Sequence, residues 1–208
     1  PNSLPLTVIG ASLLWVGWFG FNAGSQLAAD GIAGLAFITT QTCAATTTLV
    51  WILIEWVHRG KPTVLGAATG AIAGLVAITP ACAFVTPMGA IGIGIGAGSL
   101  CYAAVTLLKP ALGYDDSLDV FGVHGVGGAW GALATGLFLA DFALADGVSQ
   151  GAQIIKQIIS IGITAVFAVV MTLAILFVLK LVMGDLRASA EDESQGLDLT
   201  QHSESAYS

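Results

Sequence analysis

Long apolar stretches alternate with short polar ones along most of the chain. Each apolar stretch is long and uniform, whereas membrane-spanning strands would alternate polar and apolar residues over about ten positions. A helix crosses the hydrocarbon core of a membrane with about 20 mostly apolar residues. The pattern therefore predicts an all-α polytopic membrane protein with six transmembrane helices, at approximately residues 4–25, 32–57, 64–78, 88–108, 118–140 and 154–183.

The composition supports the same class of protein. Of the 208 residues, 56% are hydrophobic and 9% are charged, whereas a soluble domain carries about 25% charged residues. The 27 glycines lie mostly within the apolar stretches, which favours close helix packing over flexible linkers. The formal net charge of −7 gives no reason to expect a nucleic-acid partner.

Basic residues predict the orientation of the helices in the membrane. Lys and Arg gather in cytoplasmic loops, and here they follow the second, fourth and sixth apolar stretches, as Arg59, Lys61, Lys109 and Arg187. We therefore expect a transmembrane region at residues 1–184 and a cytoplasmic C-terminal tail at residues 185–208. The chain begins with Pro1 and is apolar almost at once, so we expect a piece of a longer protein.

His124 is the only histidine inside a long apolar stretch, and Gly125, Gly127 and Gly128 follow it closely. An ionisable residue within a span is costly and indicates a functional site. The alternative, a histidine hydrogen-bonded to a neighbouring helix, stays open. Asp119 lies five residues earlier, and an acidic side chain there suits the start of a helix through the helix dipole. We prefer this structural role for Asp119 to a direct role in transport.

The first apolar stretch predicts a second functional surface. Trp18, Phe21 and Ser25 are spaced so that they share one helical face. Aromatic faces attract cations within about 6 Å, so this face suits a pore, with Asn22 and Ser25 at a polar outer entrance. The alternative is a belt of aromatic residues at the membrane interface.

Other polar positions are interpreted structurally. Glu55 is expected to anchor the end of the second stretch at the interface, and Asp115 and Asp116 are expected to be solvated loop charges. Pro80 is expected to end the third helix.

The cysteines lie in apolar stretches without the paired spacing of a metal site, and we interpret them as small buried residues. A lone histidine without cysteine or carboxylate partners in its span also argues against metal or nucleophilic chemistry. We therefore expect no metal, no cofactor and no enzyme.

Several motifs, taken in order, resemble those of the ammonium transporter family, which is related to the Rh proteins. They are Trp18-Phe19-Gly20-Phe21-Asn22-Ala23-Gly24-Ser25, Glu55-Trp56 followed by Arg59-Gly60-Lys61-Pro62, Gly70-Ala71-Ile72-Ala73-Gly74-Leu75-Val76, Thr79-Pro80-Ala81-Cys82, Asp119-Val120-Phe121-Gly122-Val123-His124-Gly125, and Gly196-Leu197-Asp198 with Ala206-Tyr207. The resemblance implies an eleven-helix fold, of which this chain matches the last six spans and the tail. The absent half would supply the other pore histidine, the outer-site tryptophan and the outer phenylalanine of the gate.

The resemblance also implies roles for individual residues. Phe21 corresponds to the inner ring of a phenylalanine gate, Ser25 to the hydroxyl of an outer ammonium site, Trp18 to a pore-lining ring, and His124 to the second of twin histidines. It implies transport of ammonium or ammonia, with methylammonium as an analogue, by a homotrimer in the lipid of the cell membrane. A PII-type regulatory protein is an expected cytoplasmic partner. The alternative function is an ammonium sensor that signals through the tail.

The tail differs from the rest of the chain in being polar and acidic, as disordered segments are. It nevertheless carries the family pattern, so we expect a regulatory segment that docks on the cytoplasmic loops, with Arg59 and Lys61 as candidate partners. The alternative is an inert, solvated tail. Its expected regulatory residues are Gly196, Asp198, Thr200 and Tyr207. By resemblance, Thr200 matches a threonine that is phosphorylated in some plant members.

Overall fold

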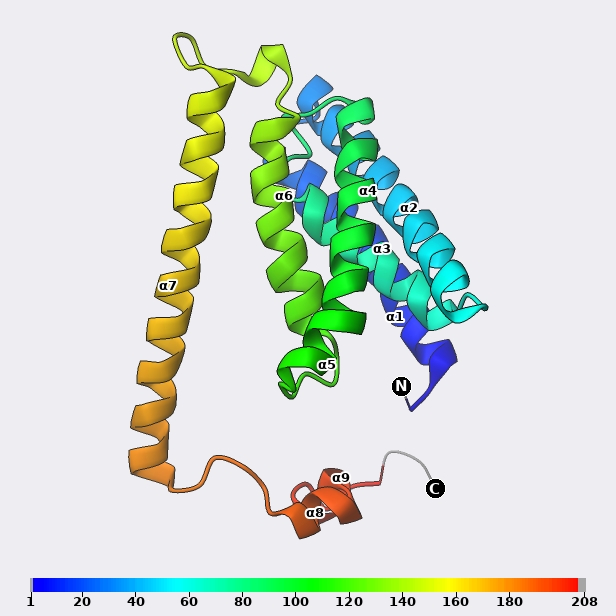
Figure 1. Cartoon of the computed structure of the whole chain (residues 1–208), viewed down its shortest axis with the longest axis vertical. Coiled ribbons are helices and arrows are strands. Elements are labelled where there is room, and N and C mark those ends of the chain that lie inside the picture. Colours follow the sequence, from blue (N-terminus) through cyan, green and yellow to red (C-terminus); the bar gives the residue numbers. More distant parts are fainter. Residues whose placement is uncertain (1, 206–208) are drawn as a thin grey trace. The chain divides into compact units, whose positions relative to one another are not determined.

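The computed structural model describes residues 2–205 of the chain, and the predicted regulatory residue Tyr207 lies outside them. The described residues form helices joined by loops (Figure 1). In order these are α1 (Leu4–Ala23), η1 (Gly24–Gln26), α2 (Gly31–Arg59), α3 (Val64–Ile78), α4 (Pro87–Ala103), η2 (Ala104–Leu108), α5 (Lys109–Leu112), η3 (Phe121–Gly125), α6 (Val126–Leu137), η4 (Asp141–Ala143), α7 (Gln150–Met183), α8 (Ala190–Gln195) and α9 (Leu197–Thr200). The all-α fold predicted from the hydropathy pattern is confirmed. Each predicted span corresponds to a helix or to a run of consecutive helical segments.

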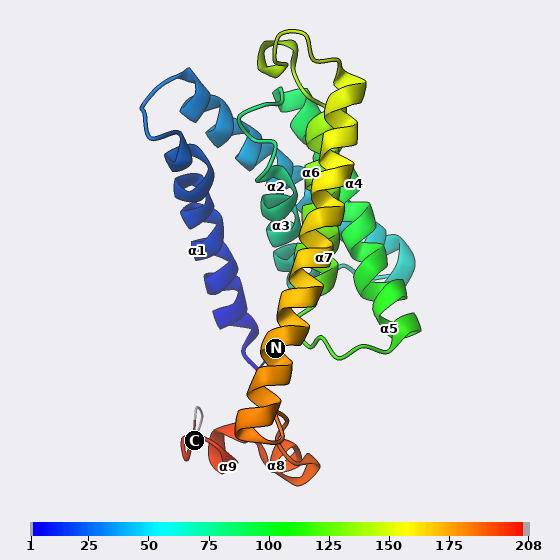
Figure 2. The same cartoon turned by 90° about the vertical axis from the view of Figure 1, so that its left-hand side faces the viewer.

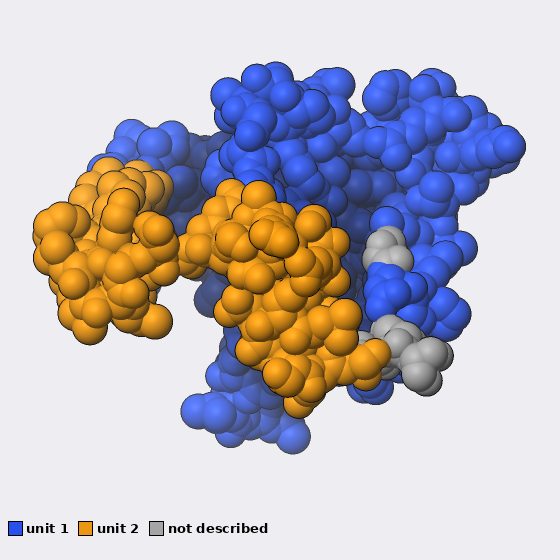
Figure 3. Space-filling model, turned by 90° about the horizontal axis from the view of Figure 1, so that it is seen from below, with its two compact units in different colours: residues 1–161 blue, residues 162–208 orange. Residues whose placement is uncertain are grey.

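The chain forms two compact units, residues 1–161 and residues 162–208, which Figure 3 colours separately. The boundary between them falls inside α7. The predicted division at residue 184 separates a membrane region from a tail instead, and it stays a prediction.

Polar side chains cap the N-termini of several helices in the first unit. Asp30 caps α2, where its Oδ1 atom accepts hydrogen bonds from the backbone N–H groups of Ile32 (2.9 Å) and Ala33 (3.0 Å). The hydrogen bond from Ala33, aided by one from the Gln26 side chain, holds the pKa of Asp30 below its usual range. Thr63 and Thr86 cap α3 and α4 in the same way. These caps satisfy backbone donors that would otherwise lack a partner at a helix start.

The short helix α3 is the centre of the first unit. It packs against α1, α2, α4 and α6 (Figure 2), and nine of its residues are buried. Two of its glycines allow α2 to approach closely. A Cβ atom built on Gly70 would lie 2.8 Å from the Cβ of Trp51, and one built on Gly74 would lie 2.7 Å from the Cα of Ala44. Such close approach through small residues is the usual way in which apolar helices associate in lipid.

Buried threonines of α2 join this helix to its neighbours. The Thr47 hydroxyl lies 2.8 Å from the carbonyl oxygen of Cys43, in its own helix, and 3.1 Å from that of Gly94 in α4. The Thr39 hydroxyl lies 2.7 Å from the carbonyl oxygen of Cys82, in the turn after α3. Because these hydroxyls are fully buried, their hydrogen bonds avoid the cost of an unpaired polar group in an apolar medium.

Glu55 does not anchor α2 at the interface, so that prediction was wrong. Its side chain is buried, and its carboxylate accepts hydrogen bonds from the backbone N–H of Thr63 (3.0 Å) and from the Thr63 hydroxyl (3.0 Å). The reason is that α2 continues to Arg59. Gly60, with a φ of +77°, then turns the chain back so that Thr63 meets Glu55.

A substitution at Gly74 tests the close approach of α3 to α2. Gly74→Ala should lower the free energy of unfolding by roughly 1–3 kcal/mol, the usual cost of overpacking a core. The matched control is Gly162→Ala, because Gly162 is also helical and a Cβ atom there would meet nothing within 4 Å. We would measure denaturant unfolding of the full-length protein in detergent micelles. Equal stability of the two variants would show that α2 and α3 do not depend on this contact.

Candidate functional site

Trp18 and Phe21 lie on the same face of α1, as predicted, but in different surroundings. Their ring centroids are 5.7 Å apart and their planes are tilted by 56°. The Phe21 side chain is exposed, whereas Trp18 is partly buried and packs against the buried cluster that contains Trp51 and Val123. The Trp18 Nε1–H group donates a hydrogen bond to the Thr79 hydroxyl at 2.8 Å. Trp18 is therefore fixed against the end of α3, and Phe21 is free to meet another surface.

Thr79 is a site residue that we did not predict. Its hydroxyl accepts from Trp18 and donates to the carbonyl oxygen of Leu75 at 2.7 Å. The sequence showed only that Thr79 precedes Pro80 at the end of a helix. No pattern in the sequence places Thr79, directly after α3, beside Trp18, which lies 61 positions earlier.

Ser25 lies in η1, directly after α1, and its side chain is exposed. Its hydroxyl donates to the carbonyl oxygen of Phe21 at 2.5 Å. Because the hydroxyl proton is used within the helix, the lone pairs of the oxygen remain available to a donor from outside. This arrangement suits a ligand that carries N–H groups.

Asn22, which we expected beside Ser25 at a polar entrance, is buried instead. Its Nδ2 group donates to the Thr40 hydroxyl at 2.9 Å. Asn22 therefore joins α1 to α2 inside the unit.

His124 lies in η3, a single π-helical turn that continues directly into α6. Its side chain is exposed, and it makes no side-chain hydrogen bond within the described residues. The preceding residue, Val123, is buried in the cluster against which Trp18 packs. The α1 face and the His124 turn therefore flank the same part of α3.

The glycines that pack this segment lie on a different face from the imidazole. A Cβ atom on Gly127 would lie 3.0 Å from the Cys101 sulfur, and one on Gly131 would overlap the backbone of Ala77. Gly128, which we expected to share a packed face with His124, has nothing within 4 Å of such an atom. Within this chain, the imidazole is thus presented outward from a segment whose other face is tightly packed.

Asp116, rather than Asp119, caps the segment that contains His124. The Asp116 carboxylate accepts from the backbone N–H groups of Val120 (2.9 Å) and Phe121 (2.8 Å). Asp119 has a left-handed backbone with a φ of +56°, and its carboxylate pairs with Lys109 at 2.7 Å. Asp116 is therefore not a free loop charge, and Asp119 acts at the helix start through an ion pair.

The tail contains ordered local structure, although its composition resembled that of a disordered segment. Arg187 pairs with Glu193 through two contacts of 2.9 and 3.2 Å, and its hydrogen bond holds the pKa of Glu193 below the usual range. Gly196, with a φ of +105°, separates α8 from α9. The Thr200 hydroxyl donates to the carbonyl oxygen of Gly196 at 3.1 Å. Asp198 lies in the first turn of α9.

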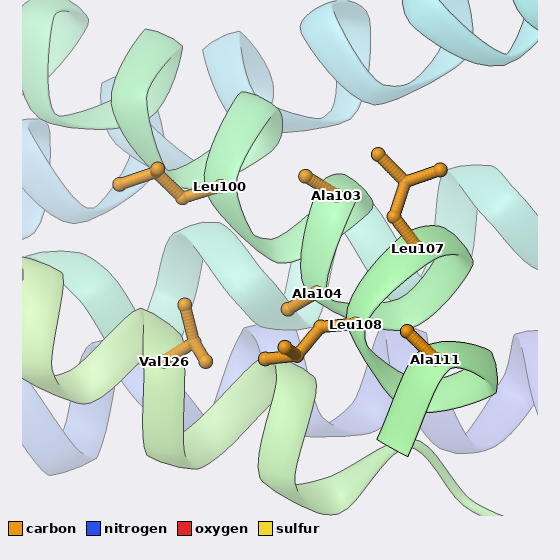
Figure 4. A pocket seen from close by; sticks show the side chains of 7 residues that line it. All are labelled: Leu100, Ala103, Ala104, Leu107, Leu108, Ala111 and Val126. Carbon is orange, nitrogen blue, oxygen red and sulfur yellow. The ribbon is translucent and has the colours of Figure 1, made fainter. Parts of the chain in front are cut away.

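A shallow groove lies where α4, η2 and α5 meet the start of α6 (Figure 4). It is lined by Leu100, Ala103, Ala104, Leu107, Leu108, Ala111 and Val126. An all-apolar lining offers nothing that would bind a cation. Among residues 2–205, no group of three or more histidine, cysteine or acidic side chains could hold a metal ion.

Four of the described helical stretches are long and apolar enough to cross a membrane, at Leu4–Gln26, Gly31–Arg59, Pro87–Leu112 and Gln150–Met183. Together with the short apolar helix α3, they define a multi-pass helical membrane protein. The chain belongs to the ammonium transporter family, because the family model described as Ammonium Transporter Family matches residues 1–207. The resemblance noted in the sequence is thereby confirmed.

The relatives of this chain are named as transporters. An "Ammonium transporter" of Bacillus subtilis (strain 168) is 52% identical over 212 residues, which cover 100% of this chain and 52% of the relative. One of Aquifex aeolicus (strain VF5) is 48% identical and is covered to 49%. The chain thus spans about half the length of these relatives.

Solved structures of the family share the fold. A structure titled "Sensor Amt Protein" has a TM-score of 0.89 and 31% identity, over 96% of this chain and 49% of the other. The crystal structure of Saccharomyces cerevisiae Mep2 has a TM-score of 0.81 and 35% identity, over 88% and 44%.

Proposed function

We propose that the protein containing this chain carries ammonium or ammonia across a membrane, and that this chain forms one wall of the pore. The observation that carries the proposal is the exposure of Phe21, Ser25 and His124 on a chain that spans about half of relatives named ammonium transporters. In an apolar bilayer, an exposed ionisable group such as the His124 imidazole calls for a polar or aqueous surrounding. The absent half of a longer protein would supply the facing wall.

Recruitment at the outer mouth follows from the chemistry of Ser25 and the aromatic rings. Ammonium is a compact cation that donates N–H groups. The outward lone pairs of Ser25 accept such a donor, and the Phe21 and Trp18 rings attract the charge through their faces. These contacts replace part of the water that the cation loses on entry. Phe21 is well placed to gate because its ring, unlike that of Trp18, is held by no hydrogen bond.

The pore beyond the gate favours the neutral form of the substrate. A charge at the centre of a bilayer costs about 2.5–3.5 kcal/mol on the translocon scale. Desolvation also lowers the pKa of a cationic amine. We therefore propose that ammonium loses a proton near Phe21 and that ammonia passes His124. The imidazole can accept a hydrogen bond or a proton there, as one member of a pair whose other histidine lies in the absent half.

Assembly and location are part of the same proposal. From the family resemblance, we propose a homotrimer in the cell membrane with a cytoplasmic C-terminus. Arg59 ends α2 and Lys61 lies in the loop that follows, and both are exposed. Basic residues at such loops favour the cytoplasmic side. A PII-type protein could bind this face, and the acidic tail could dock on the same loop.

Sensing is a second candidate, favoured by the structural neighbour whose title calls it a sensor. A sensor would bind ammonium and signal through the tail. Uptake of ammonium into vesicles that contain the full-length protein separates the two functions, because transport requires accumulation or flux and sensing does not.

The role of Ser25 can be tested against Ser12, a serine of the preceding helix α1. Ser12 also donates to a carbonyl oxygen four residues earlier, at 2.8 Å, and is exposed. Ser25→Ala should weaken the apparent affinity for ammonium about fivefold, since one hydrogen bond contributes about 1 kcal/mol. Ser12→Ala should leave it unchanged. Methylammonium uptake at a series of concentrations measures both, and equal affinities would remove Ser25 from the outer site.

The regulatory role of the tail can be tested at Thr200. A phosphate there would add nearly two negative charges beside Asp198 and disturb the bond from Thr200 to Gly196. Thr200→Asp should therefore change the uptake rate at equal membrane abundance, and so should truncation at Ala190. Thr200→Ser keeps the hydroxyl and serves as the control. Wild-type uptake by the Asp variant and by the truncated protein would leave the tail without a role in gating.

A further inference from the structure

Two π-helical turns face each other at the entrance to the segment that carries His124. The first, η2, ends α4 and leads directly into Lys109. The second, η3, contains His124. They pack closely, because a Cβ atom on Gly122 of η3 would lie 2.8 Å from the Cγ2 of Val105 in η2. A π-turn is an uncommon and less stable departure from the α-helix that is often found at functional sites.

Lys109 ties the two turns together. Its ammonium group donates to Asp119 Oδ1 at 2.7 Å and also to the backbone carbonyl oxygen of Asp116. The Lys109 and Asp119 side chains are only 27% and 29% exposed, so water screens this pair less than it screens an ordinary surface pair. One cation thus holds both ends of the four-residue turn that precedes η3.

The backbone of Asp119 requires such support. Its φ of +56° is one of three positive values at non-glycine residues in the described part of the chain. Aspartate tolerates this region better than most residues, but the conformation is still unfavourable for an L-residue. The backbone of Asp119 also affects the segment with His124, because the carbonyl oxygen of Asp119 accepts a hydrogen bond from the backbone N–H of Val123 at 3.0 Å. The residue next to His124 is therefore hydrogen-bonded directly to Asp119.

The direction in which the His124 side chain points depends on the helical register between two fixed segments, here called anchors. On one side lies the turn held by Lys109, and on the other lies α6, held by Gly127 and Gly131 against its neighbours. A π-turn contains one residue more than the α-helical path between the same anchors. If η3 became α-helical, the residues on one side of it would rotate by about 100° around the helix axis relative to the residues on the other side. The imidazole would then leave the exposed face on which it lies.

We propose that Lys109 and Asp119 are positioning residues that lock the π-turn in register and so direct His124 toward the pore. The inference rests on the proposed function for the pore itself. The orientation of His124, however, can be measured without transport.

The test uses the full-length protein in membranes, labelled with ¹⁵N-histidine and observed by solid-state NMR. The signal of His124 is assigned by its loss in His124→Ala. Lys109→Met and Asp119→Asn should each shift or broaden the His124 signals, whereas Lys109→Arg, which keeps the cation and its donors, should leave them nearly unchanged. Asp119→Asn is the milder change, because asparagine also tolerates a positive φ. The control, Arg187→Met, breaks the ion pair between Arg187 and Glu193 in the tail and should not alter the signals.

Uptake by the same variants gives a second readout. Lys109→Met and Asp119→Asn should lower the preference for methylammonium over potassium by about tenfold, which corresponds to about 1.4 kcal/mol. Lys109→Arg should retain most of the preference. Unchanged His124 signals in both Lys109→Met and Asp119→Asn would overturn the positioning role, whatever happens to uptake. Shifted signals without any effect of His124→Ala on uptake would instead support the positioning role and refute the proposed pore.

Discussion

In a lipid bilayer, two apolar helices gain little by hiding their side chains from hydrocarbon, so their association depends on close backbone approach and on internal hydrogen bonds. The contact between α3 and α2 combines both. Gly70 and Gly74 bring the two backbones together, and Thr47 bonds α2 to α4 beside them. Because α1, α4 and α6 also pack on α3, the positions of Trp18 and of the His124 turn both depend on this central helix.

Two sets of polar side chains in the membrane region differ in their surroundings. Asn22, Thr39 and Glu55 are buried and find their hydrogen-bond partners within the unit. Ser25 and His124 are exposed. The first set holds the helices together, and the second set is the basis of the proposed pore. The clearest junction between them is Trp18, whose indole is bonded inward to Thr79 while its ring lies beside Phe21.

Much of the fold could be predicted from the sequence because hydropathy and helix length reflect the membrane itself. The predicted third span at residues 64–78 coincides with α3 (Val64–Ile78). The shared face of Trp18 and Phe21 also follows from helical spacing. Spacing could not predict the tertiary contacts. These are the burial of Glu55, the hydrogen bond between Trp18 and Thr79, and the different roles of Asp116, which caps the helical segment, and Asp119, which pairs with Lys109. Each depends on a partner brought close by the folding of other segments. The π-turn at His124 has no hydrophobic period of its own by which a sequence pattern could reveal it. In the tail, α8 and α9 are separated by Gly196, whose positive φ permits a sharp change of direction.

In the proposed pore, the exposed face containing His124 lines the conducting path. The most direct measurement is uptake of ammonium and methylammonium into vesicles containing the full-length protein or its His124→Ala variant, at equal membrane abundance and with potassium as the competing cation. We expect the wild-type protein to take up both substrates, and the variant to lose uptake or to lose its preference for them over potassium. An unchanged rate and an unchanged preference in the variant would contradict this expectation, and His124 would then be a residue of the packed helix end without a role in conduction.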